Sequence, residues 1–80
     1  DSEQNILRRS QDAVFWFTKC AEFCQDSWTV SLAEFQLGEM YAKGIGVKKN
    51  HKIAEKYYRS SAEKGNPYAK KKFVAGRYVK

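Results

Sequence analysis

The chain has 80 residues, of which 42% are hydrophobic and 30% are charged, and its net charge is +6 at pH 7. This length fits one small domain and excludes a multidomain enzyme, since domains usually hold about 100 to 150 residues. The apolar content excludes a disordered tail, and no apolar run approaches the ~20 residues of a membrane-spanning helix. We therefore expect a soluble, globular chain, either cytoplasmic or the mature form of an exported protein.

The charges are divided unevenly between the two halves of the sequence. Residues 1–40 hold three basic and seven acidic side chains, whereas residues 41–80 hold twelve basic and two acidic ones, which leaves balances of −4 and +10. Positive charge concentrated in this way attracts an acidic partner at long range. A solvated helix surface is the alternative interpretation of the same pattern.

Helical periodicity dominates the sequence and predicts an all-α fold of about four helices. The first helix is expected over residues 3–24, with Ser2 as its N-cap. Apolar residues recur there at helical spacing: Ile6, Ala13, Phe17, Ala21 and Cys24.

A second helix is expected to begin at Ser31. Ser31 and Glu34 have the spacing of a capping box, in which each side chain binds a free backbone N–H of the other residue. This helix should end near Lys43, because Gly44 and Gly46 follow it and glycines interrupt helices.

Two further helices are expected in the basic half of the chain. Asn50 can cap a third helix, which closes at Gly65 in the left-handed conformation. Asn66 and Pro67 are the residue types that favour an N-cap followed by a first helical position. They predict a last helix over residues 68–79.

Small residues, aromatic residues and glycines follow one another at fixed spacing through the middle of the chain. They are Ala33, Leu37, Gly38, Tyr41, Gly44, Gly46, Ala54, Tyr57, Ala62, Gly65 and Ala69. Over residues 33–69 this pattern resembles the Sel-one-like repeat, a relative of the tetratricopeptide repeat. The resemblance implies a short α-solenoid of antiparallel helix hairpins.

Part of the same unit recurs earlier in the chain. Aligning Ala13 with Ala54 places Phe17 on Tyr58, so residues 13–24 resemble the second helix of a preceding repeat. We therefore expect one helical-repeat domain in three parts: a partial repeat and join over residues 1–30, a full repeat over 31–65, and the start of a next repeat or a C-terminal cap over 66–80. Three alternatives stay open. The chain is a fragment of a longer array, a small complete protein, or a chain that completes its core against the surface of a partner.

The repeat pattern has a direct packing interpretation. In a helix, Ala33, Leu37 and Tyr41 lie on one stripe, with Gly38 beside it. Because Ala33 and Gly38 are small, a neighbouring helix can approach closely at these positions. We therefore expect a neighbouring helix to pack against this stripe.

The sequence offers few residues for catalysis or metal binding. His51 is the only histidine, so neither a Cys–His site nor a zinc site with three or four ligands is expected, and no cofactor is predicted. Cys20 and Cys24 share a helix face, which predicts two small core residues. Alternatively, they form a disulfide if the helix ends at Cys24 and the compartment is oxidising.

The resemblance implies a protein-binding adaptor, scaffold or inhibitor, and not an enzyme. The candidate partner-binding residues are Phe35, Gln36, Glu39 and Lys43 on the second helix and Lys49, Lys52, Lys56 and Arg59 around the third. Phe35 is the foremost of them, with packing against a neighbouring helix as its alternative role. The four basic residues recur at spacings of three and four, which places them on one helix face and favours an acidic protein partner. Nucleic-acid binding is the alternative function, because aromatic residues are interleaved with the lysines.

Overall fold

The computed structural model describes residues 2–79, and the side chains of residues 9–79. This part of the chain holds four helices, α1 (Ser2–Phe23), α2 (Ser27–Lys43), α3 (His51–Glu63) and α4 (Pro67–Lys70). Two short strands, β1 (Phe73–Val74) and β2 (Arg77–Tyr78), follow α4 and pair as an antiparallel hairpin. The predicted all-α fold of about four helices is confirmed.

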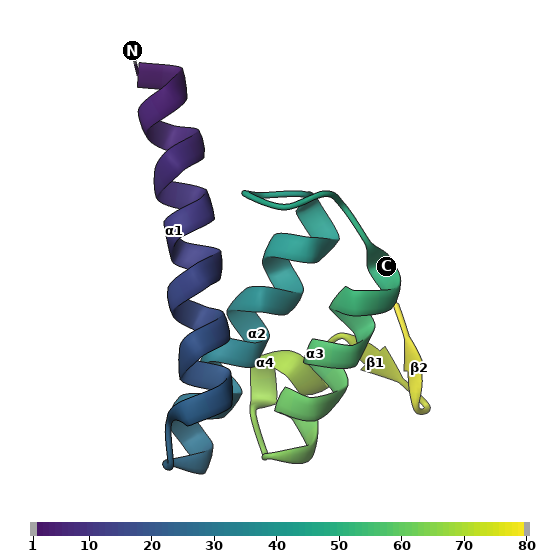
Figure 1. The fold of residues 1–80 in the computed structure, drawn as a ribbon. Coiled ribbons are helices and arrows are strands. Elements are labelled where there is room, and N and C mark those ends of the chain that lie inside the picture. The colour runs from purple at the N-terminus through teal and green to yellow at the C-terminus, as the bar shows by residue number, and fades with distance from the viewer. Residues whose placement is uncertain (1, 80) are drawn as a thin grey trace.

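The helices are arranged in the order of the chain. α2 packs against both α1 and α3, and α4 packs against α3 (Figure 1). The loop after α2 also touches α1: a Cβ at Gly46 would lie 2.6 Å from the backbone of Ser10. Glycine is therefore needed at this close approach, where its φ is also positive, at 73°. The predicted N-cap at Ser2 lies outside the side chains that the structure describes.

The second helix begins four residues earlier than predicted. Asp26 is its N-cap, and one Asp26 carboxylate oxygen accepts from the backbone N–H of Thr29 at 3.1 Å and from its hydroxyl at 2.6 Å. The hydrogen bond from the Thr29 hydroxyl, and to a smaller extent the one from its backbone N–H, hold the pKa of Asp26 below its usual range. The predicted capping box is wrong, because Ser31 lies inside the helix and its hydroxyl donates to the Trp28 carbonyl at 2.7 Å.

The boundaries of the third helix follow the prediction. Asn50 is the N-cap, and its side-chain oxygen accepts from the backbone N–H groups of Lys52 at 3.0 Å and Ile53 at 3.2 Å. Gly65 follows the helix with φ 95°, in the left-handed region as expected. Both signals are local, since each depends on the conformation of a few neighbouring residues.

The predicted last helix over residues 68–79 is wrong beyond its first turn. Asn66 does cap α4, but this helix ends at Lys70 and the chain folds back as the β1–β2 hairpin. The turn residues Ala75 and Gly76 have φ values of 53° and 80°, which match a two-residue hairpin turn. The turn brings the Phe73 ring opposite that of Tyr78, with 5.9 Å between the ring centroids.

The core lies between α2, α3 and α4. Its most deeply buried apolar side chains are Ala33, Leu37, Ala54, Tyr58 and Ala69. Gly38 lies directly against the Tyr58 ring, because a Cβ at Gly38 would be 2.8 Å from two atoms of that ring. The close approach predicted at Gly38 is therefore present, and the neighbouring helix is α3.

Candidate functional site

Polar side chains join α2 to α3 beside the core. The Ser61 hydroxyl donates to the Ser31 carbonyl at 2.6 Å, and the Ser60 hydroxyl donates to the Glu34 carboxylate at 2.6 Å. The Lys64 ammonium lies 2.9 Å from the other carboxylate oxygen of Glu34. The two residues of the predicted capping box thus connect two helices, and this connection sets the position of the basic face of α3.

Phe35 is the first of the predicted binding residues on α2. Its half-buried ring packs against Tyr58 of α3 and Tyr68 of α4, with centroid distances of 5.7 and 6.1 Å. The packing role is therefore the one that the structure describes, and a direct partner contact through Phe35 stays a prediction. Gln36, the next residue, is exposed.

Glu39 holds two lysines on the same side of α2. Its carboxylate binds the ammonium of Lys43 at 3.2 Å and that of Lys72, which follows α4, at 3.1 Å. Burial by itself would raise the pKa of Glu39, but the hydrogen bonds from Lys72 and Lys43 outweigh it and the pKa lies below its usual range. This carboxylate is therefore occupied within the chain.

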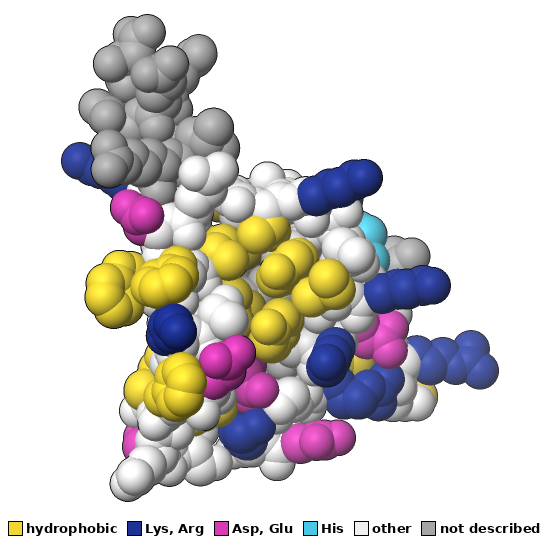
Figure 2. All heavy atoms as spheres, viewed as in Figure 1, with side chains coloured by type: hydrophobic (Ala, Val, Ile, Leu, Met, Phe, Trp, Pro, Cys, Tyr) yellow, Lys and Arg dark blue, Asp and Glu magenta, His cyan; other side chains and the backbone are white. Residues whose placement is uncertain are grey.

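The basic residues of α3 differ in the contacts that they make. Lys52 and Lys56 are exposed, and neither forms an ion pair with a carboxylate of residues 9–79. Lys49 is exposed in the same way, but it precedes the N-cap Asn50, so the prediction that it shares the helix face is wrong. Arg59, by contrast, binds Glu55 at 3.1 Å, one turn earlier on the helix. Basic side chains gather on the side of the molecule that α3 forms, next to an apolar area (Figure 2).

The structure therefore separates the predicted binding residues into two groups. Lys52, Lys56 and Arg59 lie on one stripe of α3, as their spacing predicted. The α2 group, in contrast, is linked through Glu39 to Lys72 and so faces the chain that follows α4. Of these groups, the stripe of α3 has the lysines without an ion-pair partner.

An exposed aromatic cluster on α1 was missed by sequence reasoning. Phe15 and Phe23 flank Lys19, whose ammonium lies 5.5 and 5.4 Å from the two ring centroids. Trp16 beside them is 68% exposed. Figure 2 shows hydrophobic side chains on the side of the molecule formed by α1, with basic ones among them. The spacing of four residues between Phe15, Lys19 and Phe23 is the signal that could have found the cluster.

Cys20 and Cys24 come together at the end of α1. Their Sγ atoms lie 2.7 Å apart, and both residues are free thiols. The hydrogen bond with Cys24 raises the pKa of Cys20. Cys24 is exposed, so the expectation of two small core residues is wrong for it.

The proximity of the two thiols makes their pairing testable. In an oxidising compartment, we expect Cys20 and Cys24 to form a disulfide with each other, since their Sγ atoms already lie close together and α1 ends at Phe23, one residue before Cys24. Intact-mass analysis of freshly isolated protein after alkylation measures this, with the Cys24→Ser variant as the control. Two alkylated thiols in protein taken from an oxidising compartment would contradict the prediction.

Other kinds of site have little support in this part of the chain. No three His, Cys, Asp or Glu side chains among the residues that the structure describes come together as metal ligands do. His51 is half-buried, and its Nδ1 atom lies 3.4 Å from the Tyr78 hydroxyl. Over the described range, no helix has both the length and the apolar character needed to cross a bilayer.

Comparison with known proteins assigns the central part of the chain. Residues 31–66 match the Sel1 repeat family, and this range holds most of α2, the whole of α3 and the N-cap of α4. These residues therefore form a Sel1 repeat, as the pattern of small residues and glycines predicted. A Sel1 repeat indicates a protein–protein interaction module, and such repeats are generally non-catalytic. No significant match was found among curated proteins or among solved structures.

Proposed function

We propose that this chain is a non-catalytic adaptor, scaffold or inhibitor that binds an acidic surface of a partner protein on the exposed stripe of α3. The observation that supports this proposal most is that some lysines form ion pairs with glutamates of the chain and others do not. Lys43, Lys64 and Lys72 each bind a glutamate, whereas Lys52 and Lys56 bind no carboxylate within residues 9–79. Exposed cations without partners attract acidic surfaces and increase the rate of encounter.

Nucleic-acid binding has less support, because it needs exposed rings near the lysines on which bases can stack. The two rings that follow the lysines of α3 are engaged in packing. Tyr57 stacks on Tyr41 with a centroid distance of 5.9 Å, and Tyr58 is buried against Tyr78. Tyr68, which is 57% exposed and lies 5.8 Å from the Lys71 ammonium, is the exposed ring of the basic half. Among the residues described, the two most exposed rings, Phe23 and Trp16, lie on α1 in the acidic half of the sequence.

Charge reversal on α3 tests the proposed function. We expect the Lys52→Glu/Lys56→Glu variant to associate several-fold more slowly than the parent with a fluorescently labelled oligoglutamate peptide at low salt, because the attraction becomes a repulsion. Added salt should shrink the difference, because it screens exposed charges. Stopped-flow anisotropy measures these rates. Arg59 is left unchanged because it also holds Glu55.

The control is Arg9→Glu/Lys19→Glu, which changes the net charge equally on exposed residues of α1. It should slow association less than the α3 variant does. Equal association rates for the α3 variant and the parent would contradict the proposal. Binding of random single-stranded DNA as tightly as oligoglutamate of equal charge would support the nucleic-acid alternative instead.

A further inference from the structure

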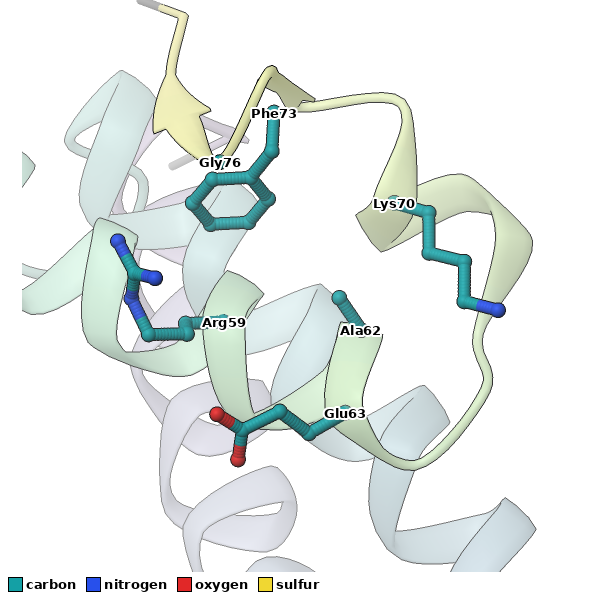
Figure 3. Close-up of a pocket in the computed structure, with 6 residues that line it drawn as sticks. All are labelled: Arg59, Ala62, Glu63, Lys70, Phe73 and Gly76. Atoms are coloured by element: carbon teal, nitrogen blue, oxygen red, sulfur yellow. The ribbon is translucent and has the colours of Figure 1, made fainter.

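A pocket of about 250 Å³ opens between α3, α4 and the β1–β2 hairpin (Figure 3). Its lining residues are Arg59, Ala62, Glu63, Lys70, Phe73 and Gly76. Helix α3 supplies three of them, and the short helix and the hairpin supply the others. The pocket thus adjoins the α3 stripe that we propose as the binding surface.

The pocket exists because α4 is only one turn long. The chain leaves α3 after Glu63, the small Ala62 side chain leaves space beside the last turn, and the hairpin turns back at Gly76. Apart from Gly76 and its two chain neighbours, no described residue has an atom within 4 Å of the place where a Cβ at Gly76 would be, so the turn also leaves its side of the space open. A longer α4, as the sequence predicted, would have placed further helical turns here.

The size and lining of the pocket indicate what it holds. An apolar cavity of about 150 Å³ is enough for benzene, and small-molecule sites usually begin near ~300 Å³. A space of about 250 Å³ therefore fits one large side chain better than a separate small molecule. The Phe73 ring and the Ala62 methyl group make its walls apolar (Figure 3).

Two cationic residues, Arg59 and Lys70, and one acidic residue, Glu63, line this apolar space. The Arg59 guanidinium lies 5.1 Å from the centroid of the Phe73 ring, and Lys70 is exposed without an ion pair to a carboxylate of the described residues. Lys56 lies one turn before Arg59 on the same stripe. Basic side chains therefore lead from the lysines of α3 to the rim of the pocket.

We propose that the pocket receives one large apolar side chain of the partner polypeptide, whose neighbouring residues are Asp or Glu. This inference rests on the proposed function and adds the residue that anchors the partner. The apolar side chain packs between Phe73 and Ala62, and the acidic neighbours lie along Arg59 and Lys56. Charge attracts the partner, and the buried side chain holds it, since burial of an anchor residue mainly lengthens the lifetime of a complex.

Two labelled peptides test the anchor: an oligoglutamate peptide with one central Phe, and the same peptide with Ala in place of Phe. We expect the Phe peptide to bind the parent about tenfold more tightly, which is the lower end of the gain for burying a large apolar side chain. The Ala62→Leu variant fills the pocket. It should abolish this gain and leave the affinity for the Ala peptide unchanged.

The matched control is Ala42→Leu, which adds the same atoms to a half-buried position of α2 outside the pocket. It should keep the tenfold preference. Amide NMR spectra of the parent give a second measurement that needs no variant. The Phe peptide should shift the amide signals of Phe73 and Gly76, and the Ala peptide should not.

The outcomes separate the pocket from the binding surface. If both peptides bind the parent with equal affinity, the pocket proposal is overturned. The proposed binding of an acidic partner would still be supported. A tenfold preference that survives Ala62→Leu would also overturn the pocket proposal. Failure of both peptides to bind would overturn both proposals.

Discussion

Replacing Gly38 by Ala should destabilise the domain by about 1 to 3 kcal/mol, although alanine is normally the better helix former by about 1 kcal/mol. The added Cβ would lie 2.8 Å from two atoms of the Tyr58 ring. That ring is 1% exposed and is held between Phe35 and Tyr78, so it has little room to move. Gly38→Leu should cost more. Denaturant unfolding followed by circular dichroism measures both variants.

A second background tests the cause of this effect. In a Tyr58→Leu variant the ring is gone, so the cost of Gly38→Ala should become smaller. Gln36→Ala, on the exposed side of the same helix, should change stability by less than about 0.5 kcal/mol. An unchanged unfolding midpoint for Gly38→Ala would refute the close approach of α2 and α3.

Replacing Lys64 by Met should destabilise the domain by about 1 to 2 kcal/mol. The Glu34 carboxylate is 11% exposed and would keep only the Ser60 hydroxyl as a partner. A buried charge that loses its counter-ion is costly, although the 31% exposure of the Lys64 side chain lets water reduce the penalty. Thermal unfolding at neutral pH measures the change.

A double-mutant cycle isolates the pair itself. Glu34→Gln keeps the ability to accept from Ser60 and removes the charge, so Lys64→Met should cost less in that background. Lys70→Met is the control, because Lys70 is exposed and binds no carboxylate among residues 9–79. A similar loss of stability for Lys64→Met and Lys70→Met would show that the Glu34–Lys64 pair contributes nothing.

The Sel1 repeat could be predicted because its signals are local or involve very small residues. Asn50 caps α3 through its own side chain, and Gly65 takes the left-handed conformation that other residues resist. Gly38 indicates a close approach in any helix that has a neighbour. The fold of the repeat could therefore be predicted from these residues.

The capping box failed because two arrangements use the same residues. Ser31 and Glu34 have the right spacing to cap a helix, but here the Glu34 carboxylate and the Ser31 backbone carbonyl accept from a second helix, and the Ser31 hydroxyl donates to the Trp28 carbonyl. The bonds to Ser61 and Ser60 appear only when α3 packs against α2. Asp26, a charged acceptor at the end of the short join, caps the helix instead.

The candidate site was only partly visible in the sequence. Spacing alone placed Lys52, Lys56 and Arg59 on one stripe of α3. It could not separate lysines that have partners from those that do not, because ion pairs such as Lys72 with Glu39 join residues far apart in the chain. The pocket next to this stripe was not predicted at all, since it depends on the end of α4.

The sequence by itself therefore determined the all-α class, the limits of the repeat and the basic character of α3, because helical period, caps and charge are local properties. Only the tertiary structure decided the C-terminal segment. Its residue pattern was compatible with a helix, but the left-handed turn at Ala75 and Gly76 brings Phe73 and Tyr78 together. Tyr78 then packs on the buried ring of Tyr58. Because these two residues are far apart in the sequence, their contact depends on the position of α3 in the folded chain.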